Sequence, residues 1–441
     1  MLPSTIRSKH SNSSQYLNRF YKFGVKKIDM RFSFIRSNHS AKVSSRVICF
    51  LLLITILVNS STITIATFDT NTPIIGQKIH SNIIIDWNNL ITELGIKEKL
   101  SPPEFARVYA LVHVAMYDSL LAAATNREEY SATFDNKSFY VSSIAEAAST
   151  VLNYLFPNHS DEIDKLKSIQ IGQVQNYDDN NLSIQSGQML GHRVSQAVID
   201  HAKTDNSNLL WNSTKTLPVK NQKCTWNGSN PINPMAGFWK TYILKSGSEV
   251  QPEIPTQCNS EADLQDVRET YDTSKNRTPK HNAAIHYWGD KPPPVVWNNI
   301  LNQHIQKYNM SILQVAYSSV YLNVGMYDGF VSCWYTKYNY WTARPFQRIG
   351  NITTEIPTPN FPGYTSGHSV ISMVASRVLG EIFPDERDYF KGQAIEAALS
   401  RLLAGIHFKQ DIINGIDQGD KVAEKVVDDM HKPIHPFIYG S

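Results

Sequence analysis

An internal duplication constrains the fold of this 441-residue chain more than any other feature of its sequence. Three fragments recur in the same order, which argues for duplication because chance matches would be scattered. Two of the pairs share nearly one offset, and the third has a shorter one, as an insertion in the second copy would produce. The pairs are VHVAMYD at 112–118 with LNVGMYD at 322–328, ASTVL at 148–152 with ASRVL at 375–379, and GHRV at 191–194 with GDKV at 419–422.

Both copies show apolar residues at helical spacing, and strand signals are limited to short pieces at 241–244 and 352–355. We predict an all-α fold of two duplicated four-helix bundles packed together. The first bundle covers 67–204 and the second 281–441. Between them, 205–280 is rich in Pro, Gly, Ser and Asn and is predicted to be a loop-rich excursion. The predicted helices begin at Ser101 and then span about 142–156, 160–177, 183–204, 311–337, 366–383, 384–404 and 407–430.

The first 66 residues are typical of a targeting segment. A basic, Ser-rich arm precedes a short apolar run at 47–58 and small residues that end at Ala66, the order found in secretory signals. A start at Met30 would give the signal a more usual length. An uncleaved membrane anchor at 47–58 is the alternative, although the run is short for a membrane span. Either interpretation predicts a secreted or otherwise extracytoplasmic protein.

The four cysteines fit that compartment weakly. Cys49 lies in the apolar run, whereas Cys224 and Cys258 flank a Pro/Asn/Gly-rich stretch and could form a disulfide. Cys333 lies in a helical pattern and is predicted to be buried and reduced. The spacing suits neither a zinc site nor a CxxC redox pair.

Several functional classes find no support in the sequence. The net charge is only +3, and no basic stripe with interleaved aromatics is present, so nucleic-acid binding is not expected. Motifs of the GxGxxG, P-loop, HExxH and GxSxG types are missing. His113, His192 and His286 show no ordered ligand pattern and are interpreted as structural.

Three fragments of the second copy carry residues that suit an oxyanion. The first is Lys337 followed by Arg344-Pro345, the second is 362–368 (PGYTSGH), and the third contains Arg401, His407 and Asp411. Lys337, Arg344 and Arg401 would supply three positive charges, and guanidinium groups match the paired oxygens of phosphate-like groups.

The remaining residues of these fragments would complete the site. Ser366 is predicted to cap a helix with Gly367 beside it, so that a hydroxyl and free helix amides face the anion. Asp411, four residues after His407 on the same helix face, can accept one imidazole N–H and leave the other nitrogen free. His368 is a second imidazole, suited to moving protons. Taken singly, each of these residues could have a purely structural role; the combination in this order favours a site.

The combined signature resembles the superfamily shared by vanadium-dependent haloperoxidases and type-2 phosphatidic-acid and acid phosphatases. The resemblance implies an all-α fold like that of vanadium chloroperoxidase and a pocket for vanadate or phosphate. In that family the residue matching His407 is either the ligand of vanadium or the nucleophile toward phosphorus. The family's oxygen-binding positions correspond to Lys337, Arg344, Ser366, Gly367 and Arg401, and His368 matches its acid–base group. Thr365 departs from the family, where Pro often precedes Ser-Gly-His.

Other features favour the haloperoxidase branch. The two-bundle length exceeds what a one-bundle soluble phosphatase needs, and no further apolar span of membrane length follows residue 66. Trp334 and Phe361 resemble the aromatics that line the halide side of such pockets. The resemblance therefore implies vanadate as cofactor, with hydrogen peroxide, a halide and a small organic acceptor as reactants.

Two alternatives stay open. One is a metal-independent acid phosphatase that acts on phosphate esters through a phosphohistidine at His407, and the other is a non-catalytic oxyanion binder. In the first copy Val141 stands where His368 would be, so we interpret that copy as scaffold. The halide, the organic substrate and the oligomeric state are not fixed by the sequence.

Overall fold

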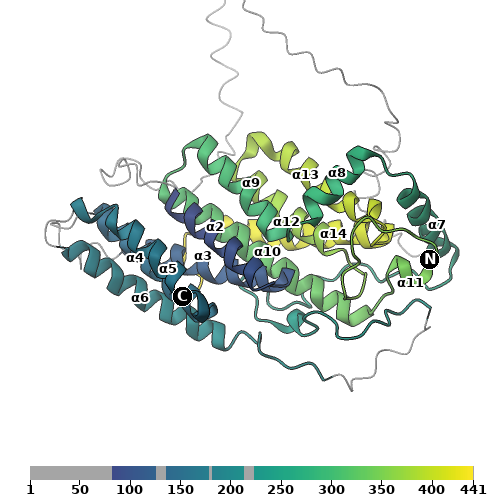
Figure 1. The fold of residues 1–441 in the computed structure, drawn as a ribbon, viewed down its shortest axis with the longest axis horizontal. Helices are drawn as coiled ribbons and strands as arrows, with labels where there is room; N and C mark the ends of the chain where they lie inside the picture. The colour runs from purple at the N-terminus through teal and green to yellow at the C-terminus, as the bar shows by residue number, and fades with distance from the viewer. Residues whose placement is uncertain (1–81, 126–135, 178–180, 213–222, 441) are drawn as a thin grey trace, which may run out of the picture. The chain divides into compact units, whose positions relative to one another are not determined.

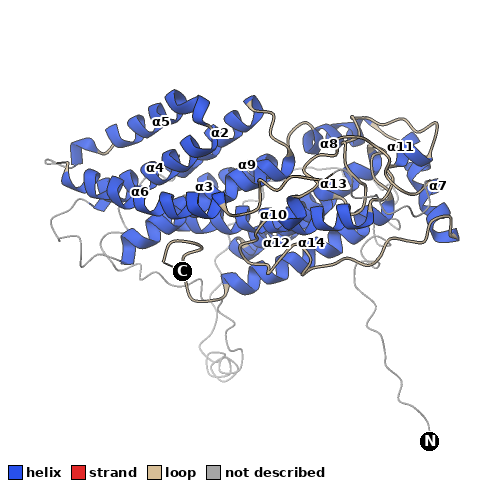
Figure 2. Ribbon diagram, turned by 90° about the horizontal axis from the view of Figure 1, so that it is seen from below, coloured by secondary structure: helices blue, strands red, loops and turns tan. Residues whose placement is uncertain are grey.

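A computed structural model of the chain describes residues 82–125, 136–177, 181–212 and 223–440. These residues fall within one compact unit, Thr70–Ser441. They form helices and no strand, apart from one isolated bridge between Thr225 and Thr342, so the predicted all-α fold is confirmed (Figure 2). The predicted targeting segment 1–66, with Cys49 and the apolar run, lies outside the described residues.

The first copy forms a bundle that also includes α2 (Asn82–Lys97), a helix that the sequence did not predict. Helix α3 (Pro102–Thr125) is its central element. It is long and apolar enough to pass for a membrane span, so the prediction that no such span follows residue 66 is wrong, but 83% of its apolar window is buried inside the protein. This is the pattern of a core helix. The helices are α2 (Asn82–Lys97), α3 (Pro102–Thr125), α4 (Asn136–Leu155), α5 (Ser160–Gly172) and α6 (Leu182–Lys203).

The second copy forms a bundle around α10, which packs against α3 and so joins the two copies (Figure 1). The helices predicted from periodicity are all present, with small shifts at their ends. The helices of this half are α8 (Pro279–Gly289), α9 (Pro293–Tyr308), α10 (Ile312–Tyr340), α11 (Pro345–Arg348), α12 (Gly367–Ile382), α13 (Arg387–Leu403) and α14 (Lys409–Met430).

Equivalent glycines bring the helices of each bundle into close contact. A Cβ on Gly191 of α6 would lie 2.3 Å from the carbonyl oxygen of Ser143 on α4. A Cβ on Gly419 of α14 would lie 2.4 Å from the carbonyl oxygen of Val370 on α12. Both glycines therefore serve the same close approach of two helix backbones, which explains why this fragment recurs in the two copies.

The two copies are also joined by a reciprocal pair of aspartates, Asp118 and Asp328, which end the recurring MYD fragment. Asp328 accepts hydrogen bonds from the backbone N–H groups of Tyr242, Ile243 and Leu244, in the chain that leaves the first bundle. Asp118 accepts from those of 437–439, in the chain that leaves the second bundle. Each copy thus binds the segment that follows the other copy.

The predicted loop-rich excursion over 205–280 is wrong in its last part, because Glu261–Lys275 form helix α7 and α8 begins at Pro279. The buried positions of α7 are polar, so hydrophobic periodicity could not reveal this helix; they are Asp263, Asp266, Thr270 and Ser274. The predicted extended pieces at 241–244 and 352–355 form no strand. In the first of them, the backbone amides instead bind Asp328.

The structure settles the pairing that the sequence left open, and the prediction for Cys333 is confirmed. Cys224 and Cys258 form a disulfide with a Cα–Cα distance of 6.0 Å, and Cys333 is free and buried in α10. The disulfide joins the loop before the second bundle to the segment that leads into α7.

Candidate oxyanion site

Lys337 reaches the site from the last turns of α10 and is fully buried. Its ammonium donates to three carbonyl oxygens of the loop before α12: Pro362 at 3.1 Å, Gly363 at 2.8 Å and Thr365 at 2.5 Å. The loop therefore surrounds the ammonium, and these three hydrogen bonds hold the loop in place. Burial lowers the pKa of Lys337, since desolvation disfavours the charged form.

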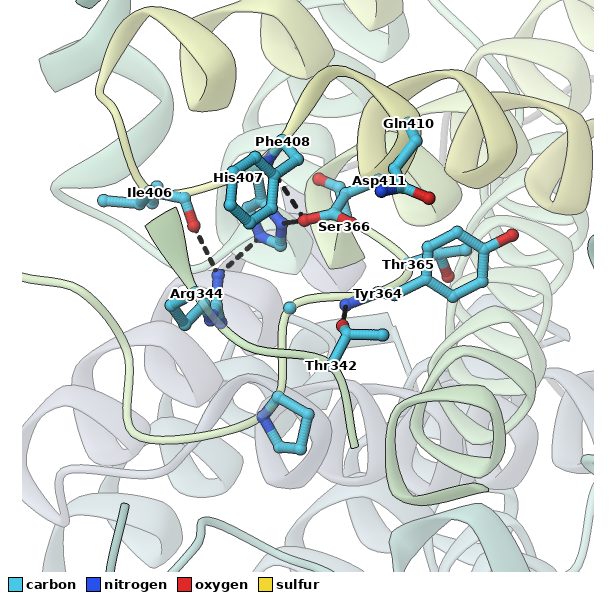
Figure 3. Close-up of polar contacts among 12 residues, drawn as sticks. Thr342, Arg344, Tyr364, Thr365, Ser366, Ile406, His407, Phe408, Gln410 and Asp411 are labelled. Carbon is cyan, nitrogen blue, oxygen red and sulfur yellow. Dashed lines mark hydrogen bonds and ion pairs between the residues drawn. The ribbon is translucent and has the colours of Figure 1, made fainter. Parts of the chain in front are cut away.

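Arg344 precedes α11 and is also fully buried. Its Nε donates to the Phe361 carbonyl at 2.8 Å. Its Nη1 donates to the Ile406 carbonyl at 2.8 Å and lies 2.9 Å from Nε2 of His407 (Figure 3). The second terminal nitrogen, Nη2, is buried and has no hydrogen-bond partner among the described residues. One edge of the guanidinium is therefore free to bind an acceptor that the protein itself does not supply.

His407 lies between α13 and α14, directly after a turn at Gly405, whose φ of +75° favours glycine. Its Nδ1 is 2.9 Å from Oδ2 of Asp411, the same oxygen that accepts the backbone N–H of Phe408 (Figure 3). Arginine can only donate, so Nε2 must accept from Arg344, and Nδ1 carries the hydrogen that is donated to Asp411. The imidazole is thus held neutral with a lone pair on Nε2.

The predicted pairing of His407 with Asp411 is confirmed, but its predicted basis is wrong. We expected both residues on one helix face, whereas α14 begins only at Lys409. The contact forms across the helix start, because Asp411 in the first turn reaches back to the residues that precede the helix.

Ser366 is the N-cap of α12, as predicted, and its side chain accepts the Ser369 backbone N–H at 3.4 Å. Gly367 follows, and a Cβ there would lie 3.5 Å from the ring of Trp334. The loop before α12 is linked directly to the His407–Asp411 pair, since the Ser366 backbone N–H donates to the Asp411 backbone carbonyl at 2.9 Å.

His368 and Arg401 are both held by backbone carbonyls of α8. His368 is half-buried, and its Nε2 lies 2.8 Å from the Trp288 carbonyl; that nitrogen must carry the hydrogen, which leaves Nδ1 as the basic nitrogen. Arg401, buried on α13, donates from Nη2 to the Ile285 carbonyl at 2.7 Å. A Cβ on Gly289 would lie 2.9 Å from Nη1 of Arg401, so a larger residue there would displace the end of the guanidinium.

The charged side chains of the site influence the two histidines. Burial lowers the pKa of His407 well below its usual value, and Arg344, Lys337, His368 and Arg401 lower it further. Burial and the same three cations lower the pKa of His368 as well. His407 therefore lies within electrostatic reach of the other four residues, and His368 within reach of the three cations. Both imidazoles are neutral near pH 7.

The site holds more positive than negative charge. Burial lowers the pKa of Arg344 and of Arg401 to about 10, which still leaves both guanidinium groups charged at neutral pH. Burial raises the pKa of Asp411, and Asp266 raises it further. No ion pair to Lys337, Arg344 or Arg401 is found within the described ranges. Because buried charges normally require a partner, the site is suited to an anion.

Trp334 and Phe361 form an aromatic wall beside the cations. Their ring centroids are 4.9 Å apart. The Lys337 ammonium lies 5.1 Å from the Phe361 ring centroid, and the guanidinium carbon of Arg344 lies 4.8 Å from it. The structure therefore places both predicted aromatics at the site, while their role toward a halide stays a prediction.

The sequence did not reveal the hydrogen bonds that hold the loop before α12, residues 362–366, in place. Thr365, which stands where Pro often occurs in the family, is fully buried and donates through Oγ1 to Gln418 at 2.6 Å. Gln418 in turn donates to Ser332 and Thr336 of α10, each at 2.9 Å. Hydrogen bonds thus hold the loop where a proline ring would restrict it. The only signal in the sequence for these hydrogen bonds was Gln418, a polar residue at a position of α14 that faces the core.

The comparisons with known proteins agree with this geometry. Residues 314–422, which run from α10 into α14, match the model described as "PAP2 superfamily". The resemblance predicted from the motifs is therefore confirmed over this part of the chain. No curated protein sequence matches the chain.

Solved structures share the fold over most of the chain. The structure of a bacterial vanadium-dependent iodoperoxidase aligns with a TM-score of 0.63 at 23% identity, over 79% of this chain and 96% of that one. The holo-type structure of a bacterial vanadium-dependent chloroperoxidase aligns with a TM-score of 0.61 at 15% identity, over 76% and 94%. Together with the superfamily match, this likeness supports an enzyme of the haloperoxidase-like or phosphatase-like kind.

Proposed function

We propose that this protein is a vanadate-dependent haloperoxidase, which oxidises a halide with hydrogen peroxide. In the overall reaction, halide, hydrogen peroxide and one proton give hypohalous acid and water. The observation that carries the proposal is the buried, unpartnered Nη2 of Arg344 beside the lone pair of His407. A small organic acceptor would then consume the hypohalous acid.

The donor set fits vanadate, a tetrahedral oxyanion. Lys337, Arg344 and Arg401 supply positive charge for its oxygens, and the free Nη2 of Arg344 supplies a hydrogen bond that nothing in the described protein uses. Ser366 and Gly367 begin α12, where helix amides favour an anion. His407 offers a neutral nitrogen, the form in which histidine binds metals.

The protein's own groups would divide the work as follows. Asp411 holds the tautomer of His407, so that Nε2 always faces the site. Bound vanadate would supply a Lewis-acidic centre that polarises hydrogen peroxide. The three cations stabilise negative charge that develops on oxygen, and Nδ1 of His368 accepts a proton from the peroxide.

The aromatic wall favours the peroxidase over the phosphatase. Trp334 and Phe361 exclude water beside two cations, which suits a halide because it needs positive charge and forms no directional contacts. The likeness of the fold to a bacterial iodoperoxidase and a bacterial chloroperoxidase gives further support.

The superfamily match keeps one enzymatic alternative, in which Nε2 of His407 attacks a phosphate ester and His368 protonates the leaving oxygen. A non-catalytic oxyanion binder is the remaining alternative.

One experiment separates these functions. The purified protein is incubated with orthovanadate, and peroxide-dependent halogenation of an activated diketone is measured with chloride, bromide and iodide, beside hydrolysis of a phosphate ester. We expect halogenation that requires vanadate and is lost in His407→Ala. Vanadate-inhibited hydrolysis without halogenation would support the phosphatase, and neither activity would support the binder.

We also propose that the protein acts outside the cytoplasm. The Cys224–Cys258 disulfide supports this, since disulfides persist mainly in oxidising compartments.

A further inference from the structure

Helix α7 binds the backbone at the start of α14 through one carboxylate, that of Asp266. This side chain is largely buried, with 8% of its surface exposed. It accepts the backbone N–H of Lys409 at 2.8 Å and that of Gln410 at 3.0 Å. These are the first two residues of α14, directly before Asp411.

The position of these two amides matters for the anion site. The first amides of a helix have no partner within the helix, so their hydrogen bonds determine where the helix begins. A negative charge at this end also stabilises the helix. Because His407 meets Asp411 across the helix start, a shift of that start would move the imidazole of His407 relative to Arg344. In the structure, Nη1 of Arg344 lies 2.9 Å from Nε2 of His407.

Helix α7 is itself firmly held, so it can act as a reference for this position. Asp263, one turn before Asp266, forms a two-pronged ion pair with Arg348 at 2.6 and 2.7 Å. Arg348 belongs to α11, the short helix that follows Arg344. On the other side, Glu269 pairs with the Lys409 ammonium at 2.6 Å. Helix α7 therefore connects the segment that carries Arg344 with the segment that carries His407.

We infer that Asp266 is a positioning residue of the oxyanion site: its carboxylate fixes the first turn of α14 and thereby the placement of His407 and Asp411 opposite Arg344. The inference rests on the proposed oxyanion site, but it does not depend on whether that site serves a peroxidase or a phosphatase. Asp266 forms no hydrogen bond to another member of the site, and its negative charge raises the pKa of Asp411; its geometric link to the site runs through the backbone of α14.

The test measures the affinity of the full-length protein for inorganic phosphate by isothermal titration calorimetry. Asp266→Ala removes both hydrogen-bond acceptors, and Asp266→Asn keeps one acceptor oxygen. We expect phosphate affinity to fall in both variants, more in Ala than in Asn, by about 5- to 100-fold for Ala, the usual range of coupling between linked sites. Glu269→Gln is the matched control, because Glu269 lies on the same helix and binds the Lys409 and Gln265 side chains but no backbone amide of α14. Its affinity should stay within about twofold of the wild type.

Melting temperatures without anion show which variants fold, and if Ala does not fold, Asn alone decides. Phosphate affinity equal to the wild type in a folded variant overturns the inference, and so does an equal loss in Glu269→Gln. Halide oxidation is measured separately: a wild type that binds phosphate but oxidises no halide refutes the proposed function and leaves this inference standing.

Discussion

Replacement of Arg344 by lysine tests whether the guanidinium edge is reserved for an anion. The variant keeps a positive charge but replaces a planar fork by a point charge. In the structure, Nε and Nη1 already bind the Phe361 and Ile406 carbonyls and His407, whereas Nη2 has no partner. The lysine therefore keeps the charge near the site but loses the donor that faces the anion.

The size of the effect follows from that single donor. A hydrogen bond between charged groups contributes about 1.5–3 kcal/mol. At about 1.4 kcal/mol per factor of ten, Arg344→Lys should bind phosphate about 10- to 150-fold more weakly than the wild type.

Calorimetric titration with phosphate measures this change, and Arg107→Lys serves as the control. Arg107 is a partly buried arginine with a carbonyl and a carboxylate partner. It lies in the first bundle, on α3, and not in the oxyanion site. Its variant should bind phosphate like the wild type. If Arg344→Lys, correctly folded, binds phosphate as tightly as the wild type, the free edge of Arg344 has no role in binding and the reasoning is refuted.

Two further predictions concern stability. Burial lowers the pKa of His113 to about 3, so this histidine stays neutral in the folded protein while it becomes charged in the unfolded chain as the pH falls below about 6.5. The free energy of unfolding should therefore fall by about 2 kcal/mol between pH 7 and pH 5 because of His113. Denaturation at both pH values should show a smaller fall in His113→Gln, and an equal fall contradicts this role of His113. Asp328→Ala leaves three amides inside the protein without an acceptor and should destabilise by about 3–5 kcal/mol. Asp118→Ala should cost less, since its partners lie near the C-terminus and can turn to water; a melting temperature that falls more in Asp118→Ala than in Asp328→Ala contradicts this order.

The residues that bind the anion could be recognised from sequence because their chemistry is local. Serine is a preferred helix N-cap, so Ser366 is a local signal for the start of α12, and the spacing of His407 and Asp411 allows a contact whether or not both lie in the helix. Most helices of both copies were also predictable, since they have an apolar face that periodicity detects, whereas α2, α8 and α9 were not predicted.

The supporting elements could not be recognised in the same way. Helix α7 has polar residues at its buried positions, because its partners are Arg348 and the amides of α14, so its sequence is like that of a loop. The Trp288 and Ile285 carbonyls, which hold His368 and Arg401, are backbone groups and leave no trace in the sequence. Contacts of this kind depend on tertiary structure alone.

Equilibrium binding of orthovanadate to the purified chain tests the central claim, a single buried oxyanion site in which three cations surround His407. The account predicts one vanadate per chain, competitive displacement by phosphate, and much weaker vanadate binding in His407→Ala. Vanadate binding that phosphate does not displace, or that His407→Ala leaves unchanged, would contradict it.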